Sequence, residues 1–150
     1  LRVQGESRFV VGQRQVRVRH TYQLSASVAS PQEIHFAVPG PVRFQSWRVV
    51  SGSVRIRSFE PRWPIEFFGV QVWRLSLDRP IKDTAVLELT SEPVPLTGLT
   101  VSLSMPQPIG VETMDLRASV RIAPGTPWQV ETDGSLEARP PLPNDGWVEM

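Results

Sequence analysis

A regular alternation of apolar and polar residues near the N-terminus constrains the fold of this chain more than any other feature. The residues of the apolar phase occupy even positions and are Val16, Val18, His20, Tyr22, Leu24, Ala26 and Val28. Successive side chains of an extended strand point to opposite faces, so a period of two is typical of a half-buried strand. The pattern predicts a long antiparallel strand with one buried face and one solvated face.

The same alternation returns along the chain between breaks rich in proline and glycine. Further strands are expected near residues 2–11, 34–38, 42–50, 54–57, 70–77, 85–89, 99–105, 116–122, 128–132 and 136–138. Turns at 51–53 and 78–83 are expected to join the strands beside them as hairpins. The chain has 15 prolines, which disfavour long helices. The expected fold is all-β, an antiparallel two-sheet sandwich of immunoglobulin-like architecture, with a closed barrel as the second choice.

The length of 150 residues, 16.8 kDa, fits one domain. Residues 1–138 are expected to form a single β-sandwich domain, and 139–150 a proline-rich C-terminal segment that serves as a linker or a terminal strand. The chain starts at Leu1 and not at methionine, which suggests a module of a longer polypeptide. An extracytoplasmic location (periplasmic, cell-surface or secreted) is expected. No apolar run approaches the ~18 residues of a membrane helix, so no transmembrane segment is expected.

Charge and cysteine content exclude several classes of function. A net charge of +1 does not favour nucleic-acid binding, which needs a large excess of cations. The absence of cysteine excludes disulfides, cysteine-ligated metals and a cysteine nucleophile. Outward-facing arginines are expected at Arg17, Arg19, Arg55, Arg57, Arg117 and Arg121. They would either form one basic strip for an acidic polymer or, as we favour, keep separate strands soluble.

An aromatic segment between residues 59 and 69 offers the clearest candidate binding site. Trp63, Phe67 and Phe68 lie among prolines and turns, where aromatic rings are often only partly covered. Trp128 is in a similar context, and Arg62 adds a cation beside the segment. Together these five residues are the candidate binding platform, for a glycan or a protein partner. The more common alternative is that they cover an open end of the sandwich, whereas Trp47 and Trp73 are expected to pack between the sheets.

Catalytic and metal-binding motifs are absent from the sequence. His20 is in phase with the apolar face and is expected to be a hydrogen-bonded structural imidazole, and His35 is expected to be exposed. Glu60 and Glu66 could serve as the acid pair of a glycan hydrolase, but nothing else supports this chemistry. Asp133-Gly134 is better explained as a turn than as a calcium loop. No catalytic residue, metal or cofactor is therefore expected.

These observations favour a non-catalytic structural or interaction module of a larger extracytoplasmic or surface protein. Its expected partners are neighbouring domains of the same polypeptide or another protein. A carbohydrate-binding module that uses exposed aromatic residues is the alternative, and a small glycan-active hydrolase is the third choice. None of these motifs identifies a protein family.

Overall fold

The computed structural model describes residues 1–26, 30–40, 42–62, 69–98 and 101–129, and within these ranges every regular element is a β-strand. The strands are β1 (Arg2–Val11), β2 (Gln15–Ser25), β3 (Glu33–Pro39), β4 (Phe44–Ser51), β5 (Ile56–Pro61), β6 (Val70–Leu77), β7 (Thr84–Ser91), β8 (Val94–Pro95), β9 (Gln107–Ile109) and β10 (Thr113–Ile122). No helix in the described ranges could cross a lipid bilayer.

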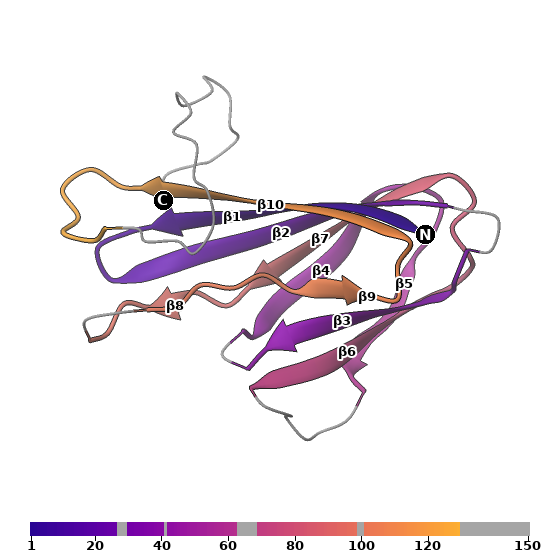
Figure 1. The fold of residues 1–150 in the computed structure, drawn as a ribbon, viewed down its shortest axis with the longest axis horizontal. Helices are drawn as coiled ribbons and strands as arrows, with labels where there is room; N and C mark the ends of the chain where they lie inside the picture. The colour runs from indigo at the N-terminus through magenta and orange to yellow at the C-terminus, as the bar shows by residue number, and fades with distance from the viewer. Residues whose placement is uncertain (27–29, 41, 63–68, 99–100, 130–150) are drawn as a thin grey trace.

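The described strands form two stacked open sheets and not a closed barrel (Figure 1). Sheet A has six strands in the order β10-β1-β2-β7-β4, with β8 also paired to β2. Sheet B has four strands in the order β5-β6-β3-β9. The prediction of an all-β, two-sheet fold is confirmed.

One sheet is mixed, so the expectation of purely antiparallel sheets is wrong. β10 pairs with β1 in parallel, in an unbroken register from Arg2 beside Thr113 to Val11 beside Ile122. The chain reaches β10 from β9, which belongs to sheet B, and therefore enters sheet A by a crossover and not by a hairpin. Alternation shows which face of a strand is buried, but it does not encode the direction of its neighbour.

Crossovers also overturn the two expected hairpins. β4 and β5 belong to different sheets, as do β6 and β7, so residues 51–53 and 78–83 carry the chain from one sheet to the other. A further strand was expected at 99–105, but the described residues 101–105 are not in a strand. The segment 139–150 and the strand expected at 136–138 lie outside the described residues.

The main core lies between the sheets and is formed by the apolar faces that the alternation predicts. Tyr22 of β2 packs against Phe36 of β3, with ring centroids 5.2 Å apart, and the Tyr22 hydroxyl donates a hydrogen bond to the backbone oxygen of Pro106. Leu24, Leu75 and Leu87 are fully buried in the same cluster. Burial of such side chains supplies the main driving force for folding.

A second, smaller core lies where sheet A extends beyond sheet B. Figure 1 shows β10, β1 and β2 continuing past β3 and β6 toward β8. Phe9, Val11, Val16 and Val18 are buried there, and Leu103 and Trp128 pack against them. Residues 101–105 thus contribute to a core although they form no strand.

The two faces of β2 give a direct test of this architecture. Replacement of Leu24 by Asp should lower the free energy of unfolding by about 3 to 5 kcal/mol, because it places an unpaired charge in the main core. Ser25, the next residue, is half-buried on the opposite face, so Ser25→Asp should cost less than about 1 kcal/mol. Urea denaturation measures both variants, and equal losses would contradict the assignment of faces.

Candidate functional site

The structure does not test the predicted binding platform, because three of its five residues lie outside the described ranges. These residues are Trp63, Phe67 and Phe68, and Glu66 lies outside as well. Trp128 is half-buried and packs against the second core. Arg62 is exposed just beyond β5, where its backbone N–H donates to the backbone oxygen of Val72 at 2.7 Å.

The outward arginines do not form one basic strip. They lie in pairs on β2, on or just before β5, and on β10, and no two of these strands are hydrogen-bonded neighbours. Glu88 of β7 forms an ion pair with Arg48 of β4, at 3.0 Å. Glu60, the proposed hydrolytic acid, is exposed and pairs with Arg74 at 3.0 Å. These contacts fit a solvated sheet surface.

The first candidate surface is an aromatic cluster where β4 of sheet A faces sheet B. It consists of Phe44, Trp47, Phe59 and Trp73, with ring centroids of contacting pairs 4.9 to 5.6 Å apart. Trp73 is half-buried as expected, whereas Trp47 is 39% exposed and so is not enclosed between the sheets. A polar groove lined by Arg48, Ser51 and Arg55 lies beside Trp47. Trp47 pairs with the buried Leu89 of β7, after a register shift between Phe44 and Ser46, but it lies on an edge strand. The alternation is interrupted at 47–50, so the sequence did not reveal this exposure.

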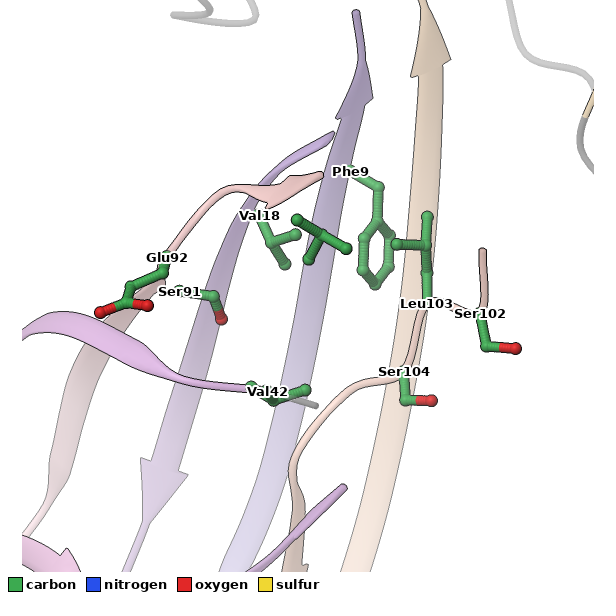
Figure 2. Close-up of a pocket in the computed structure, with 9 residues that line it drawn as sticks. Phe9, Val18, Val42, Ser91, Glu92, Ser102, Leu103 and Ser104 are labelled. Carbon is green, nitrogen blue, oxygen red and sulfur yellow. The ribbon is translucent and has the colours of Figure 1, made fainter. Parts of the chain in front are cut away.

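The second candidate is a small pocket beside the second core, with a volume of about 20 Å³, and it is partly open to solvent. Figure 2 shows Phe9, Val18 and Leu103 converging in it, whereas the side chains of Glu92 and Ser102 point away. Its lining is mostly apolar. Ser91, at the end of β7, contributes a hydroxyl that is nearly fully buried.

Behind Ser91 lies a chain of three buried polar side chains from three strands. His20 Nε2 is 3.0 Å from Ser91 Oγ, and His20 Nδ1 is 2.6 Å from Ser7 Oγ. A neutral imidazole has one donor and one acceptor nitrogen, and each finds a hydroxyl here. Phe9 and Phe44 enclose the ring edge-on, both at 6.4 Å. The three side chains connect β1, β2 and β7 across the interior of sheet A.

The environment of His20 opposes a role as a catalytic base. Burial lowers the pKa of His20 from 6.5 to about 4. A general base works best with a pKa near the working pH, and a serine–histidine pair normally has a carboxylate to stabilise the imidazolium. Ser7 occupies that position with an uncharged hydroxyl. The arrangement therefore resembles a structural polar link more than a nucleophilic site, as expected for His20.

The third candidate surface is β10, an edge strand of ten residues. Among the described strands, β1 is its one hydrogen-bonded neighbour. Its even positions are in register with core-facing residues of β1, and therefore share their face. These positions are all apolar: Met114, Leu116, Ala118, Val120 and Ile122. Leu116 and Val120 are half-buried against the two cores, whereas Met114 is 45% exposed and Ile122 39% exposed, so the opposite layer covers this face only in part.

The other described edge strands are short, contain a proline or have register shifts, and β10 has none of these three features. β8 and β9 are two and three residues long, and each contains a proline. β4 has two register shifts against β7, and β5 has one against β6. Short strands, prolines and bulges are the usual protection of exposed edges. β10 is long and unbroken, contains no proline, and carries its charged residues on the outer face alone.

No group of three or more metal-ligating side chains that could hold an ion occurs in the described part of the chain. Comparison with known proteins found no matching family model, no similar curated protein and no similar solved structure. The geometry of these surfaces is therefore what indicates a function for this chain.

Burial of neutral His20 should make stability depend on pH. The unfolded chain binds a proton at this histidine below about pH 6.5, whereas the folded chain does not until about pH 4. The free energy of unfolding should therefore fall as the pH drops from about 6.5 to about 4, by about 3 kcal/mol in total. Above pH 6.5 this contribution is constant.

Urea denaturation between pH 4 and 8 measures this slope in the unaltered chain and in His20→Gln. The substitution should remove most of the slope between pH 4 and 6.5, whatever it does to the absolute stability. His35→Gln is the matched control. It makes the same substitution at a half-buried histidine of sheet B, away from the link of Ser7, His20 and Ser91, and this variant should retain the slope. A slope that survives in His20→Gln would contradict this account.

Proposed function

We propose that this chain is a non-catalytic interaction module that binds an extended segment of a protein partner along β10. The observation that carries the proposal is the combination, on one ten-residue strand, of a long edge without proline or bulge and an apolar face whose ends, Met114 and Ile122, are exposed. An extended segment that adds to a sheet edge gains backbone hydrogen bonds, and its alternate side chains give specificity. Such a partner would carry apolar residues at every second position.

Strand addition at β10 is physically favourable for two reasons. The backbone groups on the edge that no described strand pairs can form hydrogen bonds to a new strand. The apolar side chains of a new strand would also cover Met114 and Ile122, and burial of apolar surface is worth about 25 cal/mol per Å². The outer face, with Asp115, Arg117 and Arg121, would remain in water.

Wider aspects of the proposal follow from the fold and the sequence. We place the module in a larger extracytoplasmic or surface protein and regard the sandwich as immunoglobulin-like. The order β1-β2-β7-β4 matches the A-B-E-D order of immunoglobulin domains if β5 and β6 are treated as an extra pair between D and E. The neutral His20 and the solvated ion pair of Glu60 support the non-catalytic part of the proposal.

Strand addition can be tested with a peptide of the sequence Arg2–Val11, the strand that β10 already accepts on its other side. The labelled peptide should bind the full chain saturably in fluorescence anisotropy. Ala118→Glu places a charge on the apolar face of the edge and should weaken binding about tenfold.

Ser119→Glu adds the same charge to the outer face of the same strand and should leave binding within about twofold. Both positions are exposed, so neither change should unfold the chain, and circular dichroism verifies this. Absence of saturable binding, or equal losses in the two variants, would contradict strand addition at β10.

Carbohydrate binding is the second candidate, and the exposure of Trp47 favours it. The indole is 39% exposed and is held edge-on against Phe59 at 5.6 Å, so one ring is available on a rigid support. Arg48, Ser51 and Arg55 in the adjacent groove could donate hydrogen bonds to sugar hydroxyls.

A titration of intrinsic tryptophan fluorescence with neutral and acidic polysaccharides tests this candidate. A binding glycan should quench the emission, and Trp47→Ala should abolish the saturable change because it removes the stacking ring. Val50→Ala, which trims an exposed neighbour in the same groove, should preserve it. No change with any polysaccharide, or a change that persists in Trp47→Ala, would exclude Trp47 as a sugar platform.

A further inference from the structure

We infer that the segment received by β10 is β10 of a second copy of this chain, paired antiparallel about a two-fold axis at Ala118. The inference rests on the proposed function, since it names the partner of the same edge. In a two-fold interface each contact occurs twice, so one strand must complement its own sequence. The sequence Thr113–Ile122 meets this condition in one register.

The apolar face of β10 limits the possible registers. Residues directly opposite each other in a pair of strands share a face. Even positions must therefore oppose even positions, or the apolar face of one copy would meet the polar face of the other. The two-fold axis must then lie between one residue and the same residue of the second copy. We name each register by this residue at the axis.

The outer-face charges select among the remaining registers. Within one chain, Asp115 forms an ion pair with Arg117 at 3.2 Å. With the axis at Ala118, Asp115 also lies opposite Arg121 of the second copy, and this pair of opposite charges forms again across the axis. With the axis at Arg117, two arginines face each other, and with the axis at Ser119, Arg117 faces Arg121 twice. Like charges directly opposite each other are destabilising, whereas opposite charges stabilise a pair of strands.

One other register also joins opposite charges but pairs less of the strand. With the axis at Leu116, Asp115 would face Arg117 of the second copy, and the overlap would cover residues 113–119 alone. Val120 and Ile122 would then have no opposite residue in the partner strand. The register at Ala118 pairs residues 114–122 and is therefore favoured.

The apolar face is also complementary at the Ala118 register. Leu116 lies opposite Val120 of the second copy, and Met114 lies opposite Ile122, so the two large exposed apolar side chains of the strand cover each other. The smallest side chain of the face, Ala118, meets its own copy at the axis. The two copies of sheet A would thus form one continuous sheet.

Sedimentation analysis of the full chain tests whether the partner is a second copy of this chain. The unaltered protein should sediment with twice the 16.8 kDa mass of one chain at micromolar concentrations. Ala118→Glu, which brings two carboxylates together at the axis, should raise the dissociation constant of the dimer at least tenfold. Ser119→Glu places a carboxylate opposite Arg117 of the second copy and should leave the dimer intact or strengthen it.

Cysteine scanning tests which residues of the two strands lie opposite each other. The unaltered chain contains no cysteine, so each variant carries a single thiol. Under mild oxidation, Ala118→Cys should form a covalent dimer rapidly, since the two thiols would lie directly opposite each other. Arg117→Cys and Ser119→Cys should crosslink far more slowly. Faster crosslinking at residue 117 or 119 would overturn the register.

A charge exchange provides an independent measurement. Asp115→Arg and Arg121→Asp should each weaken the dimer several-fold, and the double variant should restore it. Failure of the double variant to recover affinity would overturn the predicted ion pair and with it the register.

These outcomes separate the inference from the proposed function. A chain that remains monomeric at all concentrations but binds the Arg2–Val11 peptide overturns the second copy and leaves strand addition standing. A monomer that binds no peptide overturns both. A dimer that Ala118→Glu does not weaken places the interface elsewhere and overturns the inference, while the peptide experiment still decides the proposed function.

Discussion

Close packing of two apolar sheet faces is the constraint on which the rest of this structure depends. Tyr22 illustrates it, because its ring packs against Phe36 of the opposite sheet while its hydroxyl reaches the backbone oxygen of Pro106. One side chain thereby joins β2, β3 and the segment leading into β9. Burial also raises the pKa of the Tyr22 hydroxyl well above its usual range, so it remains a neutral donor. How much of each strand this core covers determines which strand faces are buried and which side chains at the edges remain exposed.

The parallel pairing of β1 with β10 requires close approach beside that core. A Cβ atom at Gly5 would lie 2.6 Å from Leu116 Cδ2 and 2.9 Å from the ring of Tyr22, so a side chain would force these neighbours apart. Glycine therefore allows β10 to lie close to β1 with Leu116 turned inward. The same pairing makes β10 an edge of sheet A among the described strands. Met114 and Ile122 remain exposed there, and the proposed binding mode uses them.

The buried polar side chains and the exposed apolar ones have different consequences for function. Ser7, His20 and Ser91 satisfy one another inside sheet A, which suits a fixed structural link. The exposed apolar side chains Met114 and Ile122 lie at an edge strand, where no described layer covers them. Apolar side chains left uncovered at an edge are typical of surfaces that contact a partner. This contrast supports the proposal of an interaction module.

The sequence by itself determined most of the long strands and the buried face of β2, but not the irregular course of 101–105 or the short strand β9. The predicted strand at 2–11 coincides with β1, and the even phase from Val16 to Leu24 is buried as expected. Alternation reports local burial, so it could place His20 inside but could not reveal that Trp47 lies on an edge, that 51–53 and 78–83 are crossovers, or that β10 is parallel to β1. Three residues of the predicted platform lie outside the described residues, and the β10 edge was missed. Only the tertiary structure decided which strands became neighbours, because strand order depends on contacts between residues far apart in the chain, which a local pattern does not record.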